Sequence, residues 1–503
     1  MPATDPPDVA ADIAFAGLRR SVVRSAGAAA VSNTFAQLLQ FAAYLVLARL
    51  APPAVFGEFA AACVLLAFGE IFSESGMTAA LLQRSDDLDE AAATALASTM
   101  VGGTGLALVA LGASPLIGWY FHSSTIGLAA AALSGHLVIN GAIGVPATLL
   151  QKRFALRRWA VEPVAVVVFG VVSAVCLSES LGVWGLVIGW YATSVTRAIG
   201  YWFAARWKPQ LSHVSIGMWK ELARYARHIL TSEAVLELMR ITNTAVIGRS
   251  LGPASLGQFR FGWRLVTQAA TPVVSASAYT LQPALVRLSD DPERTRRAVL
   301  AAFRTVSLFA FPLALVFVPL GEPLALILFG DHWRRAGEIM SALAGMGLAT
   351  GMAAVSLEIF KARGRPQLLP KLNGLWAVLA IGLTIGLSPF GARGIAFGWS
   401  ASTTVFAVAA MWLVPTVVDV RKREIAAVLA PPFVSSLVMT ALLVVLNRLL
   451  LRHAAADLAT FGKVTLELLA GGAAYLGCMA LVAPKMLAEM RGTLVSVIRR
   501  GAP

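Results

Sequence analysis

The chain consists almost entirely of apolar runs of about twenty residues, the length that an α-helix needs to cross a bilayer, joined by short charged segments. Hydrophobic residues make up 57% of its 503 residues, against roughly 45–50% in an average soluble domain. Charged residues make up only 14%, against about 25%. Because a soluble core cannot absorb so much apolar surface, the pattern predicts an all-α polytopic membrane protein without a soluble domain.

Hydropathy in a window of about nineteen residues predicts fourteen membrane spans. They lie at 28–48, 58–82, 92–113, 124–148, 160–178, 183–204, 228–248, 256–282, 298–320, 338–360, 367–388, 393–417, 426–447 and 465–484.

The basic residues are distributed unevenly between the two sides of these spans. Of the 41 lysines and arginines, 28 fall on the side of the N-terminus, 8 on the other side and 5 within spans. Because cytoplasmic loops carry the excess of positive charge, both termini are predicted to lie in the cytoplasm, with the chain in a bacterial inner membrane. This topology explains the net charge of +14 better than a nucleic-acid partner, for which the sequence has no motif.

The sequence contains an internal repeat. Residues 47–59 align with residues 247–259 without a gap, at an offset of 200, and share Arg, Pro, Ala, Gly and Phe. Two further matches follow in the same order at a slightly larger offset: 84–87 with 287–291, and 182–190 with 391–399. An ordered series of this kind indicates duplication of a unit of about six helices.

An even number of helices gives both copies the same orientation, so the two halves are expected to be related by a pseudo-two-fold axis along the membrane normal, with the substrate site between them. The glycine motif around Gly185 and Gly189 is expected to serve close helix packing. The predicted organisation is a cytoplasmic tail (1–27), an N-lobe (28–204), a cytoplasmic amphipathic linker (205–227), a C-lobe (228–418), two further spans (419–485) and a cytoplasmic C-terminal tail (486–503).

Polar residues inside the predicted spans form stripes at helical spacing, although an ionisable group at membrane depth costs roughly 2.5–3.5 kcal/mol. We expect these stripes to line one central cavity. Those assigned to substrate binding are Asn33, Gln37 and Gln40 on the first span, Arg240 on the seventh, and Arg260, Arg264 and Gln268 on the eighth. Those assigned to ion coupling are Glu70 and Glu74 on the second span and Glu233 and Glu237 on the seventh.

Two arginines one helical turn apart, Arg260 and Arg264, would repel each other without an anion or a carboxylate nearby. A guanidinium fork matches phosphate oxygens, so an anionic substrate headgroup such as a pyrophosphate is expected. The alternative for Glu233, Glu237 and Arg240 is that they only pair with one another as structural ion pairs.

Several other classes of site are not supported. The three cysteines lie in apolar runs and the six histidines lack ligand spacing, so we expect neither a disulfide framework nor a metal site, and no cofactor. No Walker lysine motif occurs, which argues against ATP coupling within the chain. Arg19, Arg20 and Arg24 ahead of the first span resemble a secretory or twin-arginine signal, but the first span takes part in the repeat.

The ordered set of motifs resembles a known family. The segment 47–59, the loop Leu81-Leu-Gln-Arg84, the loop Gln151-Lys-Arg153 and the loop 361–366 resemble polysaccharide biosynthesis transporters of the multidrug/oligosaccharidyl-lipid/polysaccharide (MOP) exporter superfamily. The resemblance implies two six-helix bundles in a V that alternate access and move an undecaprenyl-diphosphate-linked oligosaccharide between leaflets. It also implies a cationic cavity for the pyrophosphate and sugar, with the lipid tail left in the bilayer, and partner enzymes of the same pathway. Two extra C-terminal helices occur in some relatives.

We therefore expect a flippase for exopolysaccharide, O-antigen or lipopolysaccharide synthesis. The first alternative is an ion-coupled multidrug or cation antiporter of the same superfamily, which the glutamates would suit. The second is a membrane-embedded glycan polymerase or ligase, which would need a larger extramembrane loop than the sequence contains.

Overall fold

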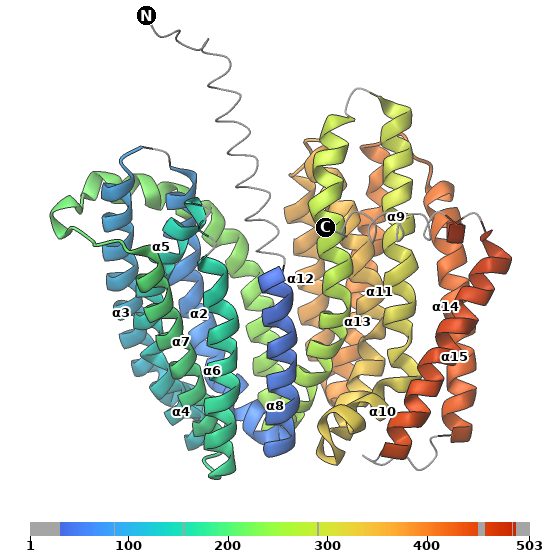
Figure 1. Cartoon of the computed structure of the whole chain (residues 1–503), viewed down its shortest axis with the longest axis horizontal. Coiled ribbons are helices and arrows are strands. Elements are labelled where there is room, and N and C mark those ends of the chain that lie inside the picture. The colour runs from blue at the N-terminus through green and yellow to red at the C-terminus, as the bar shows by residue number, and fades with distance from the viewer. Residues whose placement is uncertain are drawn as a thin grey trace, which may run out of the picture. The chain divides into compact units, whose positions relative to one another are not determined.

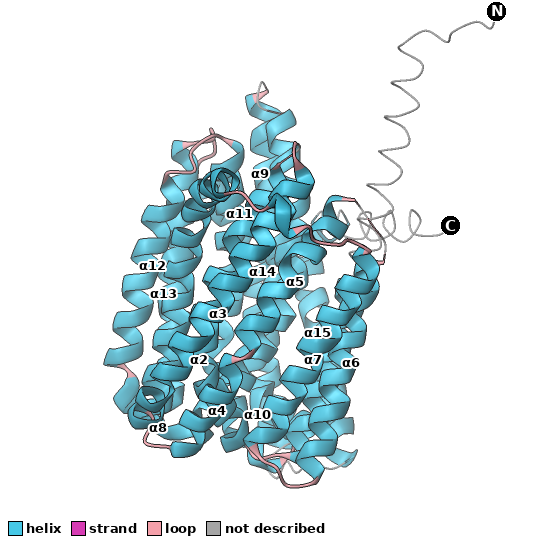
Figure 2. Cartoon of the chain, turned by 90° about the vertical axis from the view of Figure 1, so that its left-hand side faces the viewer, coloured by secondary structure: helices cyan, strands magenta, loops and turns pink. Residues whose placement is uncertain are grey.

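The computed structural model describes residues 31–84, 86–153, 155, 157–288, 291–450, 458–484 and 486–488, and within these ranges the chain is helical without strands (Figure 2). The α-helices are Val31–Leu50, α2 (Pro53–Gln83), α3 (Leu88–Tyr120), α4 (Ser124–Ser134), α5 (His136–Lys152), α6 (Arg158–Ser178), α7 (Val183–Ala205), α8 (Ile216–Arg287), α9 (Pro292–Leu315), α10 (Phe317–Phe329), α11 (Arg334–Ala362), α12 (Leu368–Gly386), α13 (Gly391–Leu413), α14 (Lys422–Leu450) and α15 (Leu458–Val482). Short 3-10 turns occur at Leu211–His213, Asp331–Trp333, Ser388–Phe390 and Val414–Thr416.

The described part of every predicted span is helical over nearly all of its length, with spans 124–148 and 298–320 each divided between two helices, which confirms the all-α polytopic fold class. Ten described helices are long and apolar enough to cross a membrane, and Pro53–Ala67 and Phe317–Phe329 are shorter apolar helices. The count of fourteen crossings therefore remains a prediction.

The helices form two compact units that divide between Arg249 and Ser250, within α8 (Figure 1). In the first unit α2, α3 and α5 pack against one another, and α6 packs along α7. In the second unit α11 packs against α9, α10 and α13, while α14 packs on α9 and α15. The lobe and linker boundaries expected from the sequence remain a prediction about membrane topology.

The duplicated motif breaks the helix at equivalent places in the two copies. In the first copy the helix Val31–Leu50 ends and α2 begins at Pro53, with Pro52 as N-cap. In the second copy α8 is interrupted at Gly252, whose φ of 81° favours glycine, and resumes at Pro253. Proline lacks an N–H donor and has a fixed φ, so it is suited to start a helix and not to continue one. The repeat therefore encodes the same local geometry twice.

The glycine motif allows close packing in both copies, as expected. A Cβ on Gly189 of α7 would lie 1.9 Å from Ser173 Oγ of α6. A Cβ on Gly398 of α13 would lie 3.1 Å from Leu383 Cβ and 3.2 Å from the Leu383 carbonyl oxygen of α12. Small residues let the paired backbones approach, which is the usual role of glycine between membrane helices.

The predicted ninth span, 298–320, is divided between α9 and the start of α10, and α10 continues beyond its predicted end to Phe329. The break lies near Pro319, which cannot donate to the Leu315 carbonyl four residues earlier. That carbonyl accepts a hydrogen bond from Thr440 Oγ1 at 3.5 Å, and Asn447 Nδ2 donates to the Pro319 carbonyl at 3.0 Å. Polar side chains of α14 therefore satisfy the backbone at this break.

The last part of the predicted amphipathic linker, residues 216–227, forms the start of α8. Met218 and Leu222 are buried in a cluster with Leu81, Ala92 and Val145 of the first unit. Trp219 and Tyr225 are each 44% exposed. One face of this helix is thus docked on protein, and Trp219 Nε1 also donates a hydrogen bond to Ser98 Oγ of α3 at 3.1 Å.

Candidate functional site

The first part of the predicted site is the helix Val31–Leu50. The side chains of Asn33 and Gln37 are exposed and that of Gln40 is half-buried, at i, i+4 and i+7. The helix is tied to its unit by Ser32 Oγ, which donates to the Trp159 carbonyl of α6, and by Tyr44, whose ring lies 6.1 Å from that of Phe169. The three amides therefore share one face, which is exposed at Asn33 and Gln37 and half-covered at Gln40.

The structure brings together two of the residues predicted on the seventh span. Arg240 Nη2 lies 2.8 Å from Glu237 Oε2, three residues earlier in α8, and the side chains are 59% and 14% exposed. The charge of Arg240 compensates that of Glu237, as expected if these residues form a structural ion pair. Most of the Arg240 side chain nevertheless stays uncovered, so a ligand could still reach it.

The predicted eighth-span residues Arg260, Arg264 and Gln268 lie on the part of α8 that belongs to the second unit. The opposite face of this helix packs against the rest of that unit. A Cβ on Gly262 would lie 2.8 Å from the Ala336 carbonyl of α11, and Val266 is 1% exposed. The Trp263 ring lies 4.7 Å from that of Trp399 on α13. Helical spacing places Arg260, Arg264 and Gln268 away from this packed face.

The three stripe residues differ in how far their unit covers them. Arg260 is exposed, whereas Arg264 and Gln268 are half-buried. The stripe thus presents two guanidinium-bearing side chains one turn apart, with an amide a further turn along. Such a set can bind an anion through charge-assisted hydrogen bonds.

Three of the assigned side chains lie outside those described: Glu70 and Glu74 of α2 and Glu233 of α8. Their role in coupling remains a prediction.

A pair of aromatic clusters was not predicted and follows the repeat. Trp190 of α7 contacts Phe59 of α2 and Phe169 of α6, with ring centroids 5.7 and 6.2 Å apart. Its repeat partner Trp399 contacts Trp263 and Trp376, at 4.7 and 6.0 Å. The Gly-Trp pair that ends each copy of the third motif could have indicated these clusters, which hold the helices that carry the stripes.

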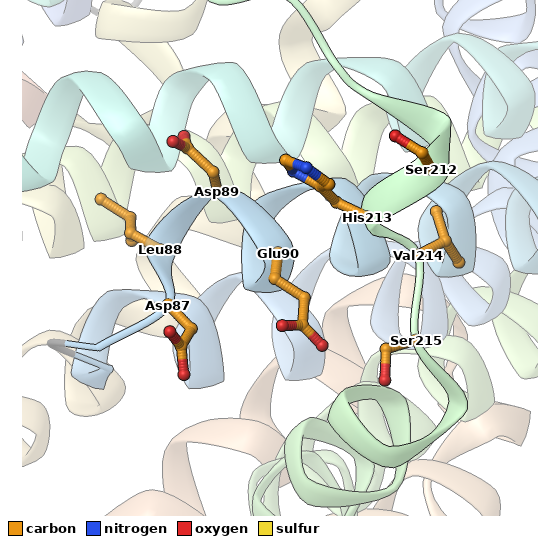
Figure 3. A pocket seen from close by; sticks show the side chains of 8 residues that line it. All are labelled: Asp87, Leu88, Asp89, Glu90, Ser212, His213, Val214 and Ser215. Carbon is orange, nitrogen blue, oxygen red and sulfur yellow. The ribbon is translucent and has the colours of Figure 1, made fainter.

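A cavity of about 540 Å³ opens in the first unit where the chain before α8 crosses the start of α3 (Figure 3). It is lined by Asp87, Leu88, Asp89, Glu90, Ser212, His213, Val214 and Ser215. Thr94 Oγ1 accepts a hydrogen bond from the Ser215 amide at 3.1 Å and holds this crossing in place. The carboxylates of Asp89 and Glu90 lie in the first turn of α3, where their negative charge interacts favourably with the helix dipole and stabilises the helix. We assign this cavity a structural role.

Two arginine–glutamate ion pairs, also not predicted, occupy related places in the two units. Arg84 Nη1 at the end of α2 lies 2.6 Å from Glu221 Oε2 in the first turns of α8. In the second unit Arg296 of α9 pairs with Glu424 in the first turn of α14. Each pair ties the segment between the second and third predicted spans of one half to the start of the helix that follows that half's sixth predicted span.

These ion pairs lead to a prediction about pH. The Arg84 guanidinium lowers the pKa of Glu221, and Arg296 together with the Arg421 amide lowers the pKa of Glu424. A lowered folded-state pKa stabilises the fold above the unfolded value of about 4.3 and loses that contribution as the pH falls through the folded value. We expect E221Q and E424Q to lower the Tm slightly at neutral pH and to match the wild type in acid. A constant difference in Tm at all pH values would contradict this assignment.

Comparison with solved structures identifies the fold. The lipid II flippase MurJ in an inward closed conformation superposes with a TM-score of 0.71 at 12% identity, over 91% of this chain and 99% of that chain. An inward-facing multidrug resistance MATE transporter of the MOP superfamily gives a TM-score of 0.60 at 17% identity, over 78% of this chain and 95% of that one. The chain therefore has the fold of MOP transporters.

The sequence comparisons identify the family. The chain belongs to the polysaccharide biosynthesis protein family, whose profile matches residues 46–338, more than half of its length. It is 25% identical over 330 residues to the succinoglycan biosynthesis transport protein ExoT of Rhizobium meliloti, covering 65% of this chain and 66%, just under two thirds, of that protein. It is 22% identical over 390 residues to the lipopolysaccharide biosynthesis protein WzxC of Escherichia coli, covering 76% and 78%. The family expected from the motifs is confirmed.

Proposed function

We propose that this protein is a flippase that moves an undecaprenyl-diphosphate-linked oligosaccharide from the inner to the outer leaflet of a bacterial inner membrane. The observation that carries the proposal is the combination of a polysaccharide biosynthesis family match over residues 46–338 with a fold that aligns with 99% of a lipid II flippase. One relative is named a succinoglycan biosynthesis transport protein and the other a lipopolysaccharide biosynthesis protein.

The chemistry of such a substrate explains the side chains that the stripes offer. Transfer of a charged diphosphate from water to hydrocarbon is strongly unfavourable. A carrier must therefore replace the water around it with fixed positive charge and hydrogen-bond donors. Arg260 and Arg264, with Arg240 and the amides of Gln37, Gln40, Asn33 and Gln268, are the groups we assign to that task. The apolar lipid tail is stable in the hydrocarbon of the bilayer, so the protein does not need to enclose it.

The alternatives have less support. A multidrug antiporter would share the fold, but the family match is to polysaccharide biosynthesis and the alignment with the MATE transporter covers less of the chain. An ion-coupled cation carrier would also prefer an acidic cavity, whereas Glu237 is paired with Arg240. A glycan polymerase or ligase would need convergent catalytic groups, and the related proteins compared above are transporters by name or fold.

A flippase of this kind is expected to have a defined membrane topology and defined partners. The excess of basic residues on the side of the N-terminus supports cytoplasmic termini. The partners are then the lipid-linked oligosaccharide, the bilayer, and the glycosyltransferases and polymerase of the same pathway, with no nucleic acid and no cofactor. Transport draws on an ion gradient, the membrane potential or the flux of substrate, with Glu70, Glu74, Glu233 and Glu237 as the coupling residues inferred from sequence.

A deletion strain tests the function. We expect loss of the surface polysaccharide and accumulation of the lipid-linked repeat unit on the cytoplasmic leaflet, both restored by the wild-type gene on a plasmid. The purified protein in vesicles should accelerate the transfer of that lipid between leaflets. Normal polymer together with a gain in sensitivity to cationic drugs would instead favour the antiporter.

A further inference from the structure

A carboxyl group that the transport site does not include is buried in the last helix. Glu467 of α15 is 0% exposed, and neither of its carboxyl oxygens has a hydrogen-bond partner among the described residues. By contrast, Glu162, Glu221 and Glu424 each form an ion pair with an arginine. Glu467 therefore differs from them in both burial and pairing.

The surroundings of Glu467 are apolar. Val464 and Gly471, at i−3 and i+4, share its face of α15. Val464 is buried in a cluster with Leu320 of α10 and Leu443 of α14. A Cβ on Gly471 would lie 3.0 Å from Leu443 Cδ1, so this face of α15 is pressed against α14. The carboxyl group is thus enclosed between the last helix and the rest of its unit.

The charged groups around Glu467 lie on its own helix and on three neighbouring helices. On α15 the other charged residue is Lys463, one turn earlier at i−4, whose side chain is exposed. On α14 the charged residues are Lys422, Arg423, Glu424 and Arg448, on α10 Glu322, and on α9 Glu293, Arg294, Arg296, Arg297 and Arg304. Glu322 pairs with Arg334, and none of these groups forms an ion pair or hydrogen bond with Glu467 within the described ranges. The nearby polar groups Asn447 and Tyr475 donate to backbone carbonyls, of Pro319 and Leu308.

An ionised carboxylate in this place would have neither an ion-pair partner nor a hydrogen-bond donor among the described residues, and burial penalises such a charge heavily. A metal ion would need several converging oxygen ligands. The described part of the chain contains no cluster of three or more metal-binding side chains. A proton is the one cation that needs only the carboxyl itself.

We propose that Glu467 is a proton-binding site, occupied at neutral pH while α15 is packed on α14 and α10. Release of the proton to water leaves a carboxylate, so it requires water to enter between α15 and its neighbours. Proton occupancy and the packing of this helix are therefore linked, and each favours the other. If the protein is a flippase as proposed above, the two C-terminal helices are then an element through which a proton gradient can bias the transport cycle.

Infrared difference spectroscopy of the full-length protein in lipid vesicles tests the site directly. We expect the wild type at neutral pH to show the carbonyl band of a protonated carboxylic acid that is lost in E467Q, which keeps the shape of the neutral group. The matched control is E179Q, at an exposed carboxyl in the turn after α6, which should leave the band unchanged. Absence of the band in the wild type, or its titration near the ordinary glutamate value of about 4.3, would overturn the proposal. The wild-type titration needs no variant to fold.

A transport measurement then separates this inference from the proposed function. In vesicles with an imposed pH gradient we expect wild-type lipid transfer to depend on the gradient and E467Q transfer to be independent of it. Unchanged gradient dependence in E467Q would overturn the coupling role while leaving the flippase intact. Absence of lipid transfer by the wild type would overturn the flippase, and the infrared band would still decide the proton site. A band that shifts with sodium concentration at fixed pH would replace the proton by a metal cation and overturn the assignment.

Discussion

Replacing Arg260 or Arg264 by glutamine, one at a time, is expected to reduce polymer export by about ten- to a hundredfold. A hydrogen bond to a charged group contributes about 1.5–3 kcal/mol, and each 1.4 kcal/mol is a factor of ten in affinity. Glutamine keeps a donor and much of the length but lacks the charge and the fork that match a diphosphate. The measurement is surface polysaccharide in a deletion strain that carries each variant, normalised to the amount of protein in the membrane.

The control for these variants is R297Q. Arg297 is exposed at the start of α9, where it lies 3.8 Å from Glu293, and it is outside the stripe. Its loss removes one positive charge with little expected effect on export, because an exposed ion pair contributes little. Normal polysaccharide in both R260Q and R264Q would show that the stripe does not bind the substrate. Loss of membrane protein in the variants would point to folding instead, and lysine at each position would then test whether charge alone restores it.

The main features of the fold follow from the sequence because they are local. Apolar runs long enough to span a bilayer must be helices, since a backbone in hydrocarbon has to satisfy its own hydrogen bonds. Pro53 fixes its own φ and lacks a backbone N–H donor, and Gly252 permits a positive φ. Both effects act within a residue or two of these positions. The packing role expected for the motif around Gly185 and Gly189 is likewise local, because it depends on small side chains at helical spacing.

The features that the sequence did not reveal depend on contacts between distant residues. Arg84 and Glu221 are 137 positions apart, and Arg296 and Glu424 are 128 apart. Each is one of many charged residues in short loops, and nothing local selects its partner. The contact between Trp263 and Trp399 likewise depends on how α8 meets α13.

Glu467 was not singled out for the same kind of reason. The polar residues chosen from the sequence form stripes, in which two or three members at helical spacing support one another. Glu467 was not part of a stripe assigned from the sequence, and its significance comes from burial, which only the packing of α14 and α10 determines. A single polar residue in a span is equally compatible with a water-filled cavity and a closed apolar junction, and these predict opposite charge states.

The largest effect on stability is expected from Gly337→Ala. A Cβ at this position of α11 would lie 2.3 Å from Glu322 Cα and 2.6 Å from the Gly321 carbonyl oxygen of α10, both backbone atoms that cannot move aside as a side chain can. Overpacking of this kind costs about 1–3 kcal/mol, more than the gain of up to about 1 kcal/mol in helix propensity. The variant should therefore lower the Tm of the purified protein.

The matched control for Gly337→Ala is Gly382→Ala on α12. No atom lies within 4 Å of a Cβ built there, so the same substitution keeps the gain in propensity without the clash, and its Tm should be equal to the wild type or higher. An equal loss in both variants would mean that glycine serves flexibility in these helices. A loss confined to Gly337→Ala would show that the backbone contact between α10 and α11 limits the stability of the second unit.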